Sequence, residues 1–140
     1  MYLGLFLTER SEEALRSCFE QELDKNLHLT IIHTAKENKV ERPDNKDFDP
    51  VVLQATFETG SFAKFGKDKD MWVIRVVDTW DDCLTKIRYN IQKWFEKNHY
   101  EYSDDYKFSP HITLTKAPTL TLKKPLPVSL TFNPLANWVY

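Results

Sequence analysis

The sequence has no excess of positive charge and no long apolar run. Its 140 residues carry a formal net charge of −2, whereas a protein that binds the nucleic-acid backbone usually has a clear basic excess. We therefore expect no large nucleic acid as a partner, while a small anion still suits a locally positive pocket. No apolar stretch approaches membrane-spanning length, and residues 2–7 are too short a run, without a basic leader, for a signal peptide. These absences predict a cytoplasmic protein with no membrane partner.

Cysteine is scarce, and the spacings that bind metals are missing. Cys18 and Cys83 are the only cysteines, and both fall on apolar faces of predicted helices, which favours free buried thiols over a disulfide. Zinc sites need three or four converging ligands, commonly spaced as CxxC or HExxH, and neither spacing occurs. No GxSxG motif marks a serine nucleophile. The sequence therefore predicts no metal and no cofactor.

The residues that are present predict a folded domain of the α+β class. Hydrophobic residues make up 41% and aromatic residues 14% of the chain, enough for one globular domain over residues 1–140. Apolar residues at helical spacing predict two helices, one capped by Ser11 and one by Thr79. Alternating apolar residues predict strands at 2–8, 27–34, 51–59, 71–77, 108–115, 128–132 and 138–140, with a helix or loop at 35–49 and a turn or loop at 60–70.

The order strand, helix, strand occurs twice, over residues 2–34 and 71–115. Two such units can face each other about a pseudo-twofold axis, with antiparallel sheets that line a central groove and helices outside. This arrangement brings the second strands of the two units together.

Each of those second strands carries the same short motif. His28-Leu29-Thr30-Ile31 and His111-Ile112-Thr113-Leu114 both place a histidine and a threonine two residues apart, with apolar residues between and after them. Side chains two apart on a strand point to one side, so each motif presents its His and Thr together. One motif alone is typical of ordinary β structure, whereas a pair on matched strands indicates a shared site. His33 lies at an odd offset from His28 and is predicted to face the other way, and His99 lies in a charged loop.

Two histidines and two threonines can carry out phosphodiester chemistry without a metal. An unperturbed imidazole has a pKa of roughly 6.5, so near neutral pH one ring can accept a proton and the other can donate one to the leaving oxygen. The threonine hydroxyls can donate hydrogen bonds to the non-bridging phosphate oxygens. His28, Thr30, His111 and Thr113 are therefore the predicted catalytic residues. The sequence leaves open which histidine is the base.

The paired motifs resemble the signature of the two-histidine (2H) phosphoesterase superfamily, the LigT-like group. The segment Ser109-Pro110-His111-Ile112-Thr113-Leu114 is especially similar, including the proline before the histidine. Residues 60–69, which lead into the strand at 71–77, resemble the element that precedes the second half in that superfamily. The resemblance covers nearly the whole chain. It implies a bilobal α+β fold, metal-free cleavage of 2′,5′-, 3′,5′- or cyclic nucleotide phosphodiesters, and the four motif residues as the active site.

The short chain lacks a large insertion that would hold a tRNA-sized substrate. In this it is similar to bacteriophage anti-CBASS enzymes, which degrade the cyclic di- and trinucleotide signals of bacterial immunity. This likeness implies a monomeric hydrolase that acts on cyclic oligonucleotides in the host cytoplasm as a means of immune evasion. Two alternatives stay open. One is a phosphodiesterase for RNA 2′,3′-cyclic phosphate ends or 2′,5′-oligoadenylate, and the other is a protein that sequesters nucleotides without cleaving them.

Aromatic residues are candidates for holding the bases, because each base–aromatic stack is worth about 1–3 kcal/mol. Tyr2 and Phe6 have the opposite parity to the leucines of their strand, so we expect them to line the groove. Trp72 begins the second unit in the corresponding place, and Trp138 lies close to the last residue. Tyr2, Trp72 and Trp138 are the predicted substrate-binding residues.

Overall fold

The computed structural model describes residues 2–33, 55–65, 70–102, 107–133 and 137–139. These residues form two helices and one seven-stranded sheet, which confirms the predicted α+β class. The elements in chain order are β1 (Tyr2–Phe6), α1 (Glu9–Arg16), β2 (His28–His33), β3 (Ala55–Phe65), β4 (Met71–Val77), α2 (Cys83–Lys97), β5 (His111–Thr115), β6 (Ser129–Phe132) and β7 (Asn137–Val139). Neither helix in the described ranges has the length and hydropathy needed to span a membrane.

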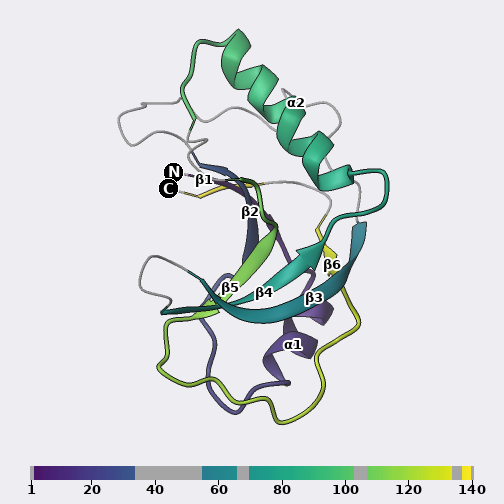
Figure 1. Cartoon of the computed structure of the whole chain (residues 1–140), viewed down its shortest axis with the longest axis vertical. Coiled ribbons are helices and arrows are strands. Elements are labelled where there is room, and N and C mark those ends of the chain that lie inside the picture. The colour runs from purple at the N-terminus through teal and green to yellow at the C-terminus, as the bar shows by residue number, and fades with distance from the viewer. Residues whose placement is uncertain (1, 34–54, 66–69, 103–106, 134–136, 140) are drawn as a thin grey trace.

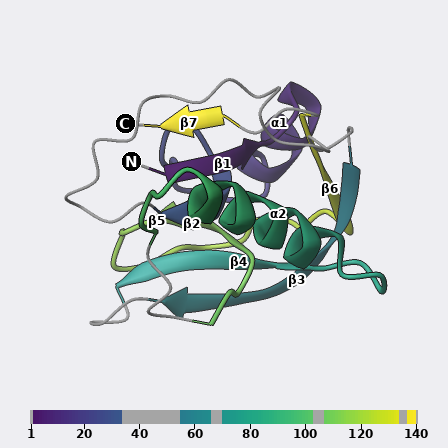
Figure 2. The ribbon, with the colours of Figure 1, turned by 90° about the horizontal axis from the view of Figure 1, so that it is seen from above.

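All neighbouring strands of the sheet are antiparallel, in the order β6-β3-β4-β5-β2-β1-β7. The sheet curls so strongly that the end of β1 approaches β6. Leu7 forms a bridge with Phe132, and the backbone N–H of Thr8 donates to the carbonyl of Thr131 at 2.9 Å. Figure 1 shows this curl, with α2 at one end of the molecule and α1 at the other. Figure 2 shows β7 beside β1, so the first and last strands lie together.

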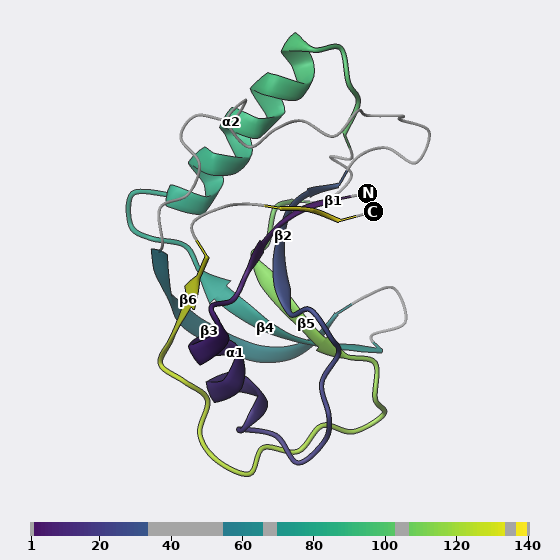
Figure 3. The same ribbon diagram turned by 180° about the vertical axis from the view of Figure 1, so that it is seen from behind.

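The two strand–helix–strand units are present, as β1-α1-β2 and β4-α2-β5. The two strands of each unit pair with each other, and β2 of the first unit pairs with β5 of the second. The view from behind shows β2 and β5 side by side in the middle of the curl (Figure 3). The units therefore share one continuous sheet, and the strands that carry the two motifs lie at its centre.

One face of the central strands is apolar and packs against both helices. Leu5 of β1, Leu29 of β2 and Ile112 of β5 are fully buried. They share one core with residues from both helices, namely Leu15 from α1 and Leu84, Ile87, Ile91 and Phe95 from α2. Burying each such side chain contributes about 1.5–3 kcal/mol. Because side chains alternate along a strand, the residues between the buried ones face away from this core.

Both helices begin with capping that differs from the prediction. Helix α1 is capped by Thr8, whose hydroxyl accepts from the Ser11 N–H at 3.3 Å, so the prediction of Ser11 as the cap is wrong. Helix α2 follows Asp82, whose side chain makes no capping bond. The first N–H groups of α2 donate instead to the side chains of Thr79 and Asp78. Asp82 therefore holds the N-cap position predicted for Thr79, although the Thr79 hydroxyl still accepts one of the capping bonds.

Strand β3 is longer than predicted. Residues 60–65, expected as part of a turn, continue β3, and the pairing with β4 shifts between Thr59 and Phe62. Gly60 stands at this shift, and a glycine inside a strand often marks such an irregularity. Read from the sequence alone, the same glycine indicates a turn. The predicted helix or loop at 35–49 lies outside the described residues.

Both cysteines are free thiols, as predicted. Cys18 is buried but follows α1 instead of lying on it, because the helix ends at Arg16. Cys83 is the first residue of α2 and is half-buried. Burial raises the pKa of the Cys83 thiol, and the negative charges of Asp78 and Asp81 raise it further. This thiol is therefore a poor nucleophile near neutral pH.

Candidate active site

The register between β2 and β5 brings the two His–Thr motifs together. The middle apolar residues of the two motifs are register partners, and the residues on either side of them pair in reverse order because the strands are antiparallel. His28 therefore lies opposite Thr113, and Thr30 lies opposite His111. All four residues are half-buried and alternate with core residues, so they share the face away from the core. The two histidines are diagonal neighbours on this face, with backbones about 7–8 Å apart.

Both imidazole rings are held by a backbone carbonyl two residues earlier. Nδ1 of His28 lies 2.8 Å from the carbonyl oxygen of Asn26, and Nδ1 of His111 lies 2.7 Å from that of Ser109. A carbonyl oxygen only accepts hydrogen bonds, so Nδ1 carries the hydrogen in each ring. In the neutral ring the proton-accepting lone pair is then on Nε2, and in the charged ring Nε2 also carries a hydrogen. Each ring is therefore set to exchange a proton through Nε2.

The chain fixes these two carbonyls by different means. Asn26 has a φ of 57°, in the left-handed region that asparagine tolerates better than most residues. Ser109 precedes Pro110, and the residue before a proline is restricted to extended conformations. A left-handed turn thus orients the first histidine, and a proline orients the second. The proline before the second histidine therefore restricts the residue whose carbonyl holds the imidazole ring.

Aromatic rings enclose the first histidine. The Tyr2 ring stacks on the His28 imidazole, with 4.6 Å between centroids and 15° between planes, and the Phe6 ring lies at 5.6 Å. Gly4 leaves space between them, because a Cβ atom there would lie only 3.4 Å from His28 Cδ2. Burial raises the pKa of the Tyr2 hydroxyl, so this group stays neutral. Tyr2 and Phe6 lie on the motif face, as their parity predicts.

Each motif strand carries a β-bulge immediately after its threonine. The extra residue is Ile31 on β2 and Leu114 on β5, as the shifts in pairing with β1 and β4 show. Both extra residues are buried in the core. A bulge bends its strand and changes the direction of the side chains beyond it, and bulges occur frequently beside active sites. The two units therefore share an irregularity as well as a motif.

The bulge at Ile31 reverses the predicted orientation of His33. Counting by twos from His28 puts His33 on the core face, but the extra residue shifts that count by one. His33 pairs with Tyr2, and its ring meets the Tyr2 ring edge-on at 5.7 Å, on the motif face. The pKa of His33 is lowered by burial first and then by nearby positive charges, which include His28 and His111. The prediction that His33 faces away from the motif residues is therefore wrong.

Arg75 lies beside the second histidine and was not identified from the sequence. It pairs with His111 across β4 and β5, so both side chains are on the motif face. The exposed guanidinium donates through Nη1 to Ser109 Oγ at 3.1 Å. Alternation with the buried Ile74 and Val76 marks Arg75 as outward-facing, but only the strand order places it next to a motif. The site is therefore aromatic around the first histidine and cationic beside the second.

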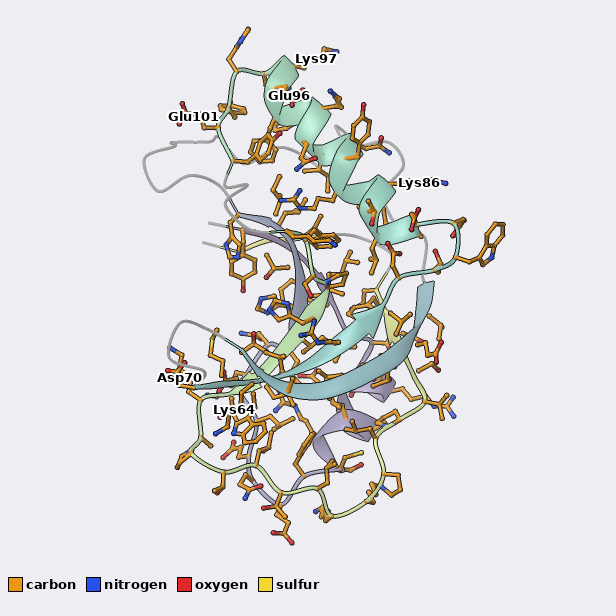
Figure 4. The ribbon with its side chains drawn as sticks, viewed as in Figure 1. Lys64, Asp70, Lys86, Glu96, Lys97 and Glu101 are labelled. Atoms are coloured by element: carbon orange, nitrogen blue, oxygen red, sulfur yellow. The ribbon has the colours of Figure 1, made fainter. Side chains whose placement is uncertain are left out.

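Trp72 packs with the core and is not brought to the motif residues. Its ring contacts the core cluster, and the indole N–H donates to the carbonyl of Ala117 at 2.9 Å. Lys64, labelled in Figure 4, places its Nζ 4.6 Å from the centre of the Trp72 ring. Counted from Phe6 and Arg75, which pair with the two motif histidines, Trp72 is the register counterpart of Leu3, whereas the sequence suggested a counterpart of Tyr2. A base-stacking role for Trp72 stays a prediction.

The remaining predictions concern the last strand, the fourth histidine and metals. The backbone of Trp138 pairs with Leu3 in the β7–β1 ladder, and its side chain is outside those that the structure describes. The substrate-binding role of Trp138 therefore also stays a prediction. His99 is exposed after α2, as expected. Within the described ranges, no three His, Cys, Asp or Glu side chains gather as metal ligands would.

Comparison with known proteins adds no assignment. No protein-family model matches the chain, and no curated protein matches it in sequence. Function is therefore inferred from the site itself.

Proposed function

We propose that this chain is a metal-independent phosphodiesterase of the two-histidine superfamily, with the bilobal fold of that group. Its proposed substrates are cyclic oligonucleotide second messengers with 3′,5′- or 2′,5′-linkages. The observation that carries the proposal is the antiparallel pairing of two His–Thr motifs with both imidazoles held at Nδ1. The enzyme acts as a monomer in the cytoplasm, and as a counter-defence enzyme in the host cytoplasm if the protein is viral.

The proposed reaction removes one proton and supplies another. The phosphate binds between His28 and His111. The neutral ring accepts the proton of the attacking water or ribose hydroxyl at Nε2 while the new P–O bond forms. The bond to the leaving oxygen breaks as the charged ring donates its Nε2 hydrogen to that oxygen. Because both rings are held in the same way, the roles can exchange if a 2′,3′-cyclic phosphate forms first and is then hydrolysed.

The threonines stabilise the charge that develops on the phosphate. Thr30 stands opposite His111 and Thr113 opposite His28, so each end of the phosphate faces one imidazole and one hydroxyl. These hydroxyls donate to the non-bridging oxygens, where negative charge grows in the transition state. Removing one donor of this kind typically costs about 10²–10³-fold in rate.

The surroundings favour a small nucleotide over a long nucleic acid. The chain has a net charge of −2, and the cationic Arg75 lies beside His111, at the edge of the four motif residues. A local cation binds a small anion without the broad basic surface that a long nucleic acid requires. Tyr2 and Phe6 add aromatic surface on which a base can stack.

A substrate panel tests this function. The protein is incubated in EDTA with cyclic di- and trinucleotides, 2′,5′-oligoadenylate and RNA ending in a 2′,3′-cyclic phosphate, and products are separated by chromatography. We expect cleavage of the cyclic oligonucleotides by wild type and a loss of about 10²–10⁴-fold in His28→Ala and His111→Ala. The exposed His99 provides a matched control, since His99→Ala removes an imidazole outside the site. A bell-shaped dependence of rate on pH is also expected.

Other outcomes would redirect or contradict the proposal. Preferred cleavage of RNA ends or of 2′,5′-oligoadenylate would keep the site and change the substrate. Tight binding without turnover of any substrate would favour a sequestering protein. Activity that persists in both histidine variants would show that the site is assigned wrongly.

A further inference from the structure

Two hydrogen-bond donors, the guanidinium of Arg75 and the imidazole of His33, lie on one flank of the motif residues. Along β2, His33 follows Thr30 on the motif face, beyond the bulge. In the antiparallel neighbour, Ser109 precedes His111 and so lies toward the same end. Arg75 reaches this end from β4 through its hydrogen bond to Ser109. Arg75 and His33, on strands at either side of β5, therefore flank the Thr30–His111 pair on the side away from the first histidine.

We propose that Arg75 and His33 bind a second phosphate of the substrate, one nucleotide away from the phosphate that is cleaved. This inference rests on the proposed function for the first phosphate position. A guanidinium binds phosphate oxygens through paired N–H groups with defined geometry, and the bond to Ser109 orients it. The imidazole of His33 adds a second hydrogen-bond donor to the same anion.

The second position is distinct from the first. Ser109, which holds the guanidinium, precedes His111 by two residues, a step of about 6.5–7 Å along an extended chain. His33 lies beyond the bulge from Thr30, in the same direction. The guanidinium is directed toward Ser109, and hence away from Thr113. A phosphate held by the two motifs therefore leaves the flank to a neighbouring phosphate of the same molecule.

A second phosphate position narrows the substrate class. Cyclic di- and trinucleotides carry two or three phosphates, each separated by one nucleoside. A nucleoside 2′,3′-cyclic phosphate carries one and would use only the motif residues. The flank therefore favours substrates with at least two phosphates.

Binding of small nucleotides tests the position without requiring turnover. Calorimetry compares adenosine 3′,5′-bisphosphate with the 3′- and 5′-monophosphates, which differ from it by a single phosphate. We expect wild type to bind the bisphosphate about 10- to 100-fold more tightly, as one charged hydrogen-bonded contact predicts. Arg75→Met and Arg75→Gln should remove most of this gain and leave monophosphate affinity unchanged. Arg75→Lys should retain part of it, because lysine supplies charge without the paired geometry, and His33→Asn should lose a smaller part.

The control variant removes one positive charge, as Arg75→Met does, but at a position outside the site. Lys86 lies on α2 and points away from the sheet (Figure 4), and it is exposed. Lys86→Met should therefore bind all three nucleotides like wild type. Thermal unfolding of each variant shows that the fold is kept, as expected for substitutions of the exposed Arg75.

Three results would overturn the inference. One is a wild type that binds the bisphosphate no more tightly than the monophosphates, or that binds none of them. Another is equal weakening of mono- and bisphosphate binding in Arg75→Met, which would assign Arg75 to the first phosphate. The third is a loss of the gain in Lys86→Met, which would make it an effect of net charge. Failure of the proposed function is a separate result, namely no cleavage in the substrate panel while the bisphosphate gain persists.

Discussion

Replacing Gly4 by alanine should displace the His28 imidazole while the protein stays folded. The added Cβ would lie 3.3 Å from the Leu29 carbonyl oxygen, 3.4 Å from His28 Cδ2 and 3.5 Å from Tyr2 Cε2. The carbonyl belongs to the β1–β2 ladder and is fixed by backbone pairing. The imidazole and the Tyr2 ring stacked on it can move instead, by a few tenths of an ångström.

The structure predicts that this change affects rate more than stability. A displacement of about 1 Å can cost about 10²-fold in rate, so a few tenths of an ångström should lower kcat by about 3- to 10-fold. In the unfolded chain, alanine has less conformational freedom than glycine, which favours the folded state by about 0.4–1 kcal/mol. The tight contacts at Gly4 offset this gain. The free energy of unfolding should therefore change by less than about 1 kcal/mol.

Two measurements separate the effects. Steady-state kinetics on the best substrate of the panel gives kcat and KM, and urea unfolding gives stability. Gly4→Val provides a graded comparison, because its larger side chain should lower kcat further. An unchanged kcat together with a stability loss of several kcal/mol would refute the reasoning, since the backbone and not the imidazole would then have absorbed the contact.

Three further predictions concern the turn, a threonine and the third histidine. Asn26 has a φ of 57°, so Asn26→Gly should preserve both stability and kcat. Asn26→Val should lower the free energy of unfolding by about 1–2 kcal/mol and also lower kcat, as measured by urea unfolding and kinetics. Identical behaviour of the two variants would show that the turn does not orient His28. Thr113→Ser should keep most of the activity and Thr113→Val should lose about 10²–10³-fold in kcat, whereas equal losses would assign the side chain to packing. The pKa of His33 is lowered from 6.5, so below that pH the unfolded state binds more protons and the free energy of unfolding falls as the pH drops. Urea titrations between about pH 7 and 5 should show a flatter fall in His33→Asn, and an unchanged slope would contradict this account.

The features that could be predicted from the sequence depend on local periodicity. Strand β4 has the predicted bounds, Met71–Val77, because its alternating apolar residues directly reflect burial on one face. The alternation of apolar residues with His and Thr along each motif likewise depends only on a period of two. Local patterns were therefore sufficient to predict the two motif strands and the apolar face with which each packs on the core.

The features that could not be predicted depend on distant parts of the chain. Thr8 and Ser11 are both good caps by residue type. The choice of Thr8 follows from the end of β1, where Leu7 bridges to Phe132 and fixes the chain just before the helix. Arg75 shows the same limit, because only the pairing of β4 with β5 places it beside His111.

Counting along the strand fails at His33, and the bulge explains why the failure begins only beyond Thr30. A bulge inserts one residue, so it changes the face of side chains beyond the insertion and of none before it. His28 and Thr30 precede Ile31 on β2 and keep the predicted face. His33 follows Ile31 and lies on the motif face, because the extra residue of the bulge breaks the alternation of side chains along the strand. The motif could therefore be found from spacing alone, whereas the third histidine required the register.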